Sequence, residues 1–262
     1  MLENIWHYRQ FIYSCVKREF QERYTGSVLG ILWSVFQPLS MILVYTVIFS
    51  QVMKSKLHGM ESTPFAYSIY LCAGVLTWNL FNETLMNIVN VFFKNANLMK
   101  KVSFPRVCLP TITVLSSFSN FIIGFLLFCL FLIIIGRFPY IHMPEVILVL
   151  AVQSVFTVGL GLGMAVLNVF FRDVGQMLGV ITQFWFWFTP VVYPVSIIPE
   201  SLRWLLNFNP MYHVVKGYQD IFVYGQHIDY VAIGGVFVLG LILCMWSLKL
   251  YHKHVGELVD EL

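Results

Sequence analysis

Six long apolar stretches constrain this chain of 262 residues more than any other feature. They cover residues 31–53, 65–91, 107–135, 144–170, 176–198 and 230–251. A helix that crosses a bilayer needs about 20 mostly apolar residues, and each stretch is long enough. Charged residues make up 11% of the chain, whereas they make up about 25% of an ordinary globular domain. The sequence therefore predicts an all-α membrane protein with six transmembrane helices.

The basic residues are distributed unequally between the segments that join these stretches. If the N-terminus is cytoplasmic, eleven Lys and Arg residues lie on the cytoplasmic side and five on the other side. Cytoplasmic loops collect Lys and Arg, so this distribution predicts that both termini are cytoplasmic. The eleven are Arg9, Lys17, Arg18, Arg23, Lys94, Lys100, Lys101, Arg106, Arg172, Lys249 and Lys253, and the five are Lys54, Lys56, Arg137, Arg203 and Lys216.

The remaining segments predict smaller elements of a single transmembrane domain, residues 1–262. We expect residues 1–30 to form a cytoplasmic interface helix, residues 31–251 the six-span bundle, and residues 252–262 a cytoplasmic tail. Apolar side chains recur at helical spacing in the first of these segments, which suits an amphipathic helix lying in the membrane interface. A soluble helix packed on a partner protein is the alternative. Between spans five and six, the apolar patches are too short to span, and we expect short re-entrant helices there.

Polar side chains follow one stripe of the second apolar stretch. Asn79, Glu83 and Asn87 recur at helical spacing, and Glu83 is the one acidic residue deep inside a predicted span. An ionisable group inside a span indicates a functional site. Asn and Glu also form ordinary hydrogen bonds between helices in a membrane. Both interpretations stand: a polar seam or a proton-linked role on one side, and a structural set of hydrogen bonds on the other.

The fourth apolar stretch contains a pattern of helix packing. Gly159 and Gly163 form a GxxxG motif. Small residues at this spacing let two helix backbones approach closely. We expect a tightly packed neighbouring helix at this position.

Several chemistries have no support in the sequence. The chain contains neither the GxxxxGK[ST] phosphate loop nor the HExxH zinc motif. A metal site formed by His142, His213 and His227 is conceivable, but we do not expect one. The net charge of +3 is too small to indicate a nucleic-acid partner.

Several motifs together resemble one family of membrane proteins. The segment "REFQERYTGSVLGILWSVFQPL" (18–39) resembles the approach to the first span in permease subunits of ABC exporters that move lipid-linked polysaccharides. The segment "LMKKVSFPRVCLP" (98–110) is similar to the cytoplasmic loop between spans two and three of that family. Each motif alone is weak, but their order and spacing match from about residue 8 to residue 250. The matching residues are Arg23, Tyr24, Ser27, Leu29, Gly30, Trp33, Pro38, Arg172, Asp173, Pro190, Tyr193, Pro194, Asn209 and Pro210.

The resemblance implies a permease that exports O-antigen, capsule or teichoic-acid glycan across a bacterial inner membrane. Such permeases work as homodimers with two copies of a separate ATPase chain, which binds ATP and Mg. This chain would then be a transport subunit, surrounded by membrane lipids, without catalytic residues or a cofactor of its own. The alternatives are an exporter of lipid or drug, a membrane-embedded glycosyl- or acyltransferase, and a passive channel.

The basic loop 92–106 predicts a contact with that ATPase. We expect a short helix around Asn95 to Lys101 to lie in a groove of the ATPase, flanked by the N-terminal interface helix. The alternative is that these charges only follow the positive-inside distribution. The predicted coupling residues are Asn95, Asn97, Lys100, Lys101, Arg106, Glu19, Arg23 and Tyr24.

The segment "QFWFWFTPVVYP" (183–194) predicts where the glycan passes. Aromatic faces bind the C–H faces of sugars weakly, and a row of weak stations lets a polymer advance. Two prolines should break the helix at the outer end of span five. A simple belt of interfacial aromatic residues is the alternative. The predicted channel residues are Phe184, Trp185, Phe188 and Tyr193, with Phe36 and Tyr45 of span one opposite them.

Overall fold

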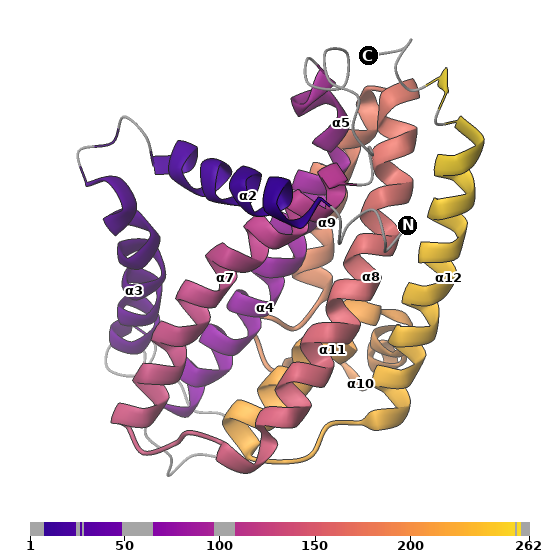
Figure 1. Ribbon diagram of the computed structural model, residues 1–262. Coiled ribbons are helices and arrows are strands. Elements are labelled where there is room, and N and C mark those ends of the chain that lie inside the picture. The colour runs from indigo at the N-terminus through magenta and orange to yellow at the C-terminus, as the bar shows by residue number, and fades with distance from the viewer. Residues whose placement is uncertain are drawn as a thin grey trace.

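The computed structural model describes residues 8–24, 27, 29–48, 65–96, 108–254 and 256–257. All regular elements within these ranges are helical (Figure 1). Three of the described helices are long and apolar enough to cross a membrane: Cys108–Ile134, Tyr140–Phe170 and Tyr230–His254. The chain is therefore an all-helical protein of membrane-spanning character, and the count of six spans stays a prediction.

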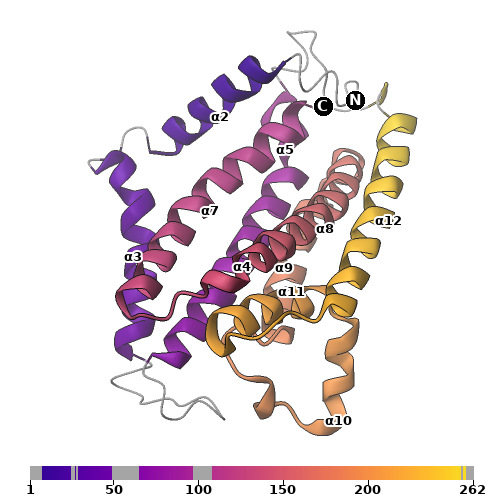
Figure 2. The same ribbon diagram turned by 60° about the horizontal axis from the view of Figure 1, so that its bottom comes forward.

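The first described helix, α2 (Arg9–Tyr24), lies across the bundle near the end at which α8 and α12 finish (Figures 1 and 2). Ile12 and Cys15 of α2 are buried against Cys108 and Ile112 at the start of α7 (Cys108–Ile134). Tyr13, on another face, is exposed. A helix is present from Arg9 onward and packs on this chain through Ile12 and Cys15, while its position in the membrane interface stays a prediction.

Helix α4 (Ala66–Val89) is the central helix of the bundle. It contacts α3 (Trp33–Tyr45), α7, α8 (Met143–Phe170), α9 (Asp173–Phe188) and α11 (Pro210–Gln219). Most of its residues are buried in the main hydrophobic core, including Trp78, Phe81 and Leu85. Because α4 is enclosed by other helices, its polar side chains face protein atoms and cavities more than a lipid surface.

Helix α9 ends inside the fifth apolar stretch, close to the two prolines that predict a break there. It ends at Phe188, whereas the apolar stretch continues to residue 198. Pro190 removes a backbone donor two residues later, and the chain turns there. Short helices follow: η4 (Val195–Ile197), α10 (Glu200–Arg203), η5 (Trp204–Phe208), α11, and the π-helical turn η6 (Asp220–Tyr224). Short helices between spans five and six are thus present, and their re-entry into a membrane stays a prediction.

Helices α8 and α12 (Tyr230–His254) pack closely through glycines. A Cβ atom on Gly159 would lie 2.8 Å from the backbone nitrogen of Cys244 and 2.9 Å from the carbonyl oxygen of Gly240. A Cβ atom on Gly163 would lie 2.2 Å from the ring of Trp246. The packing predicted from GxxxG is confirmed, and α12 is the neighbouring helix.

We expect Gly159→Ala to destabilise the fold by about 1–3 kcal/mol, because the added methyl group meets backbone atoms that cannot move independently. The measurement is thermal unfolding of the purified chain in lipid nanodiscs. Gly234→Ala is the matched control, because a Cβ atom there has no neighbour within 4 Å. Equal melting temperatures for the two variants would contradict the tight α8–α12 contact.

Candidate functional site

A cavity of about 520 Å³ lies between α3, α4 and α7. Gln37 and Tyr45 line it from α3, Asn79 and Glu83 from α4, and Asn120 from α7. The structure thus brings one predicted channel residue, Tyr45, together with two members of the predicted polar stripe. The cavity offers amide, phenol and carboxylate groups within an otherwise apolar bundle.

Glu83 is half-buried at the wall of this cavity. The side-chain nitrogen of Asn120 donates a hydrogen bond of 2.9 Å to its Oε2 atom, which joins α7 to α4. Asn82 lines the same cavity, and its buried Oδ1 atom has no hydrogen-bond partner among the described residues. Acceptors of this kind can receive hydrogen bonds from the hydroxyl groups of a solute.

A second polar cavity, of about 350 Å³, lies where α2 crosses α4, α5 (Val91–Lys94) and α7. It brings together Glu19 and Asn95 of the predicted coupling set and Asn87 of the predicted polar stripe. The Nζ atom of Lys94 donates a hydrogen bond of 3.0 Å to Oδ1 of Asn87. Asn87 also donates to Ser117 of α7, at 3.4 Å. Its amide therefore belongs to a network at the end of the bundle where α2 lies.

The other predicted coupling residues are only partly described. Arg23 and Tyr24 form the last residues of α2, and their side chains lie outside the described part of the structure. The same is true of the whole of Asn97, Lys100, Lys101 and Arg106, whose roles stay predictions.

The proline-containing turn after α9 is held by hydrogen bonds from two other helices. Tyr70 of α4 donates to the carbonyl oxygens of Pro190 and Tyr193, at 3.0 Å and 2.9 Å. Tyr67 of α4 donates to the carbonyl of Val192 at 2.9 Å, and Gln219 of α11 donates to that of Pro190 at 3.3 Å. Non-helical backbone at membrane depth must be satisfied by protein groups or by water in a cavity. Here the protein supplies the donors.

Gly74 of α4 lets this turn approach closely. A Cβ atom at that position would lie 2.7 Å from the carbonyl oxygen of Val191. The side chain of Val191 is fully buried, and it belongs to the main core. The turn is therefore an integral part of the bundle and not a loose surface loop.

The aromatic run divides between the two sides of α9. Trp185 and Phe186 pack against the core, with Trp185 in edge-to-face contact with Trp78, Phe81 and Phe156. The indole nitrogen of Trp185 donates a hydrogen bond of 2.8 Å to Oδ1 of Asn209. Of the predicted channel residues, Trp185 is thus a packed ring with a specific polar partner.

The other rings of the run lie on the outer face of α9. Phe184, Trp187 and Phe188 are 63%, 59% and 73% exposed. Tyr193 is half-exposed, and its hydroxyl group donates to the carbonyl of Trp187. Phe36 is exposed on α3. The described structure gives no direct contact between Phe36 and the rings of α9.

Among the described residues, one group of His, Cys, Asp and Glu side chains is close enough to hold a metal ion. It consists of His142, Glu145 and His227. His213, the third histidine weighed from the sequence, instead lies 3.0 Å from the carbonyl of Asn207. Glu145 was missed, because an acidic residue in the first turn of a helix is common for electrostatic reasons alone.

The comparisons with known proteins agree with this architecture. Residues 10–223 match the family model described as ABC-2 type transporter. The chain belongs to the ABC-2 type transporter family. The matched region runs from α2 to η6 and contains all the predicted channel, coupling and polar-stripe residues.

Several named proteins also match most of this chain. It is 32% identical over 224 residues to the O-antigen export system permease protein RfbA of Myxococcus xanthus, covering 85% of this chain and 84% of that protein. It is 28% identical to a protein of the same name from Klebsiella pneumoniae, covering 97% and 95% of the two chains. The polysialic acid transport protein KpsM of Escherichia coli is 19% identical, with 89% of each chain covered.

Asn209 is the residue on which we expect the stability of the contact between α9 and α11 to depend most. Its Oδ1 atom accepts from Trp185 and from the backbone nitrogens of Met211 and Tyr212, so it also caps α11. Asn209→Ala should cost about 0.5–2 kcal/mol for the lost cap, with a further cost for the indole left without its acceptor. Thermal unfolding of the purified chain measures the loss.

Asn207→Ala is the matched control, because Asn207 is exposed on the same segment. Asn209→Asp keeps the acceptor oxygen and should retain most of the stability. If Asn209→Ala unfolds at the same temperature as Asn207→Ala, the cap contributes nothing.

Proposed function

We propose that this chain is the permease subunit of an ABC exporter that moves a lipid-linked polysaccharide across a bacterial inner membrane. The observation that supports this most directly is the match over 85% to 97% of the chain to O-antigen export system permeases. The absence of a phosphate loop from the sequence fits a subunit whose energy comes from another chain. In this proposal the permease is a homodimer that works with two copies of a separate ATPase, which binds ATP and Mg.

The glycan path in this proposal runs along the exposed rings of α9. Phe184 and Phe188 are one turn apart and largely exposed, so they offer two similar stacking faces for sugars. Trp185, which packs inward, fixes the position of α9 and so orients these rings. Weak and repeated contacts let a polymer move, whereas one deep pocket would retain it.

The polar cavity between α3, α4 and α7 supports the same proposal. Its amide and carboxylate groups suit the hydroxyl groups of a carbohydrate, and Tyr45 adds a ring to its wall. Phe36 is exposed on the same helix but is not among the residues that line this cavity. Aliphatic side chains such as those of Leu76 and Leu80 complete the wall.

The cavity beneath α2 supports a role in coupling. Glu19 and Asn95 line it together with Arg18 and Lys94, at the end of the bundle from which the predicted coupling loop leaves α5. In the proposal the ATPase contacts α2 and the loop together. Its closure then moves α2 against the start of α7, where Ile12 and Cys108 are packed.

We expect Phe184→Ala and Phe188→Ala each to reduce glycan export several-fold while the amount of permease stays normal. Both rings are largely exposed, so their removal creates no cavity in the core. The measurement is surface glycan in cells that lack the native permease, compared with permease level by immunoblot. Phe237→Ala is the matched control, because Phe237 is an exposed ring on α12.

Trp185→Ala should behave differently. Loss of a packed tryptophan costs on the order of 3–5 kcal/mol, so the amount of folded permease should fall together with export. Normal export by the Phe184 and Phe188 variants would contradict the proposed path along α9.

We expect the double substitution Lys100→Glu and Lys101→Glu to separate ATP hydrolysis from export, or to release the ATPase, without lowering the amount of permease. Reversed charges would be repelled by an ATPase surface that is complementary to the basic loop. Co-purification of the ATPase and its rate of ATP hydrolysis are measured beside export. Lys54→Glu with Lys56→Glu is the control, because the same change is made on the predicted opposite side. Normal export with Lys100→Glu and Lys101→Glu would leave only a topological role for these lysines.

A further inference from the structure

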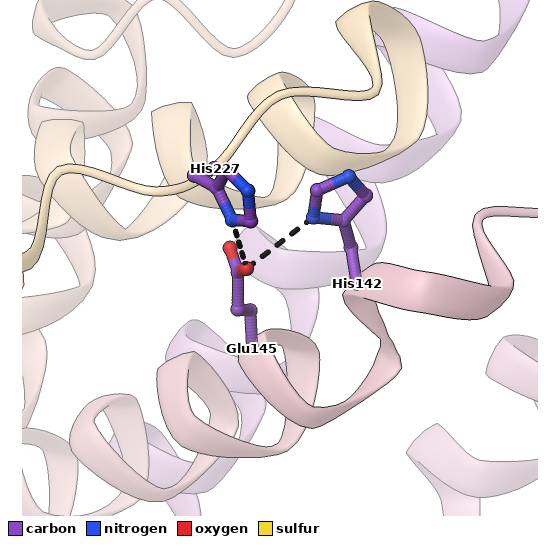
Figure 3. A group of neighbouring side chains, drawn as sticks. All are labelled: His142, Glu145 and His227. Carbon is purple, nitrogen blue, oxygen red and sulfur yellow. Dashed lines mark hydrogen bonds and ion pairs between the residues drawn. The ribbon is translucent and has the colours of Figure 1, made fainter.

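Three metal-ligating side chains converge where α8 begins. His142 is the last residue of η3 (Tyr140–His142), and Glu145 lies in the first turn of α8. His227 comes from the segment that joins η6 to α12. Figure 3 shows both imidazole rings directed at the carboxylate of Glu145. This corner lies at the end of the bundle opposite α2 (Figure 1).

The ligand atoms are already close to one another. Nδ1 of His227 lies 2.6 Å from Oε1 of Glu145, and Nδ1 of His142 lies 3.3 Å from the same oxygen. The two imidazole rings have centroids 4.7 Å apart and are nearly perpendicular. One ligand atom from each of the three side chains lies within 4.8 Å of the other two.

We propose that His142, Glu145 and His227 bind a divalent transition-metal ion, with Zn²⁺ as the best match. Zinc takes His nitrogen and carboxylate oxygen at about 2.0–2.2 Å in a tetrahedron, which places ligand atoms about 3.3 Å apart. The His142–Glu145 pair already has this separation. The His227–Glu145 pair must widen by less than about 1 Å to reach it.

The surroundings of the three side chains favour such an ion. The backbone nitrogen of Ile228 donates a hydrogen bond of 3.0 Å to Oε2 of Glu145, which fixes the carboxylate and leaves Oε1 directed at the histidines. Partners of this kind orient metal ligands and increase affinity. Two imidazoles with one carboxylate suit Zn²⁺, Cu²⁺ or Ni²⁺, whereas Mg²⁺ and Ca²⁺ prefer oxygen ligands alone.

The exposure of the three side chains is also compatible with a bound ion. The side chains of His142 and Glu145 are 13% and 11% exposed, and that of His227 is 69% exposed. The two inner ligands are therefore preplaced by the fold, and the outer one can adjust to complete the site. Water would take the fourth position of the tetrahedron.

A bound ion would add a link between two parts of the chain that already meet through hydrogen bonds to Glu145 and through the buried side chain of Ile228. The segment with His227 follows η6 and leads into α12, and α11 before it packs on α4 and α8. The ion would fasten this segment to the first turn of α8. The expected effect is a more stable fold, because the ion binds the folded chain and has no preformed site in the unfolded chain.

Zinc binding to the full-length chain in lipid nanodiscs tests the proposal. The chain is purified with a tag that contains no histidine and is stripped with a chelator, and Zn²⁺ is then titrated by calorimetry and by thermal unfolding. We expect an ion bound at this corner and a rise in melting temperature on the order of 5 °C at a hundredfold excess over the dissociation constant.

His142→Gln and His227→Gln are the decisive variants. Glutamine can still donate a hydrogen bond to Glu145 but is a poor zinc ligand. Each variant should keep the melting temperature of the metal-free chain and lose the rise caused by Zn²⁺. His213→Gln is the matched control, because His213 lies on α11 outside the cluster and should leave the zinc effect intact.

Two results would overturn the proposal. The first is that Zn²⁺ neither binds to the wild-type chain nor raises its melting temperature. The second is that His142→Gln and His227→Gln respond to Zn²⁺ as the wild type does. His142, Glu145 and His227 would then form a hydrogen-bonded cluster that binds no metal ion.

Discussion

The hydrogen bonds to the carbonyls of residues 190–193 are the interaction on which the rest of the arrangement depends. Backbone that leaves the helical state in a membrane needs partners within the protein or in a water-filled cavity. Tyr67 and Tyr70 of α4 and Gln219 of α11 supply them. These donors fix the end of α9 to the centre of the bundle. The division of the α9 rings into an inward and an outward set follows from that attachment.

The central position of α4 explains why it can contain so many polar groups. Its tyrosines serve the turn after α9, while Glu83 and Asn87, farther along the helix, bond to α7. These bonds are structural, and the same side chains line the two polar cavities. The two interpretations of the stripe are therefore compatible, because a side chain can join two helices and present its remaining lone pairs to a cavity.

Local sequence patterns predicted the elements but not their long-range partners. The prolines of segment 183–194 predicted a break in the helix, and α9 ends at Phe188, two residues before Pro190. The inward role of Trp185 depends on Asn209 and Phe81, which are distant in sequence, and no periodicity connects them. A second reason that Glu145 was missed is that most of α8 and the whole of α9 and α11 separate it from its partner His227 in the sequence. The GxxxG motif predicted the close helix packing correctly, because such packing needs only small residues on one face, whichever helix is the neighbour.

The first turn of α9, at the other end of the helix from the proline turn, is also held by a hydrogen bond. Asn168 of α8 is almost completely buried; its side-chain nitrogen donates to the carbonyl of Val89 at the end of α4, at 3.1 Å. Its Oδ1 atom accepts a hydrogen bond of 2.8 Å from the backbone nitrogen of Gly175 in the first turn of α9. One amide thus joins α4, α8 and α9 near the end where α2 lies. α9 is therefore connected to α4 at both ends, through Asn168 at one end and through Tyr70 at the other. In the proposed export cycle, these two attachments are the route by which a movement of α4 beside the cavity beneath α2 would reach the outward rings of α9.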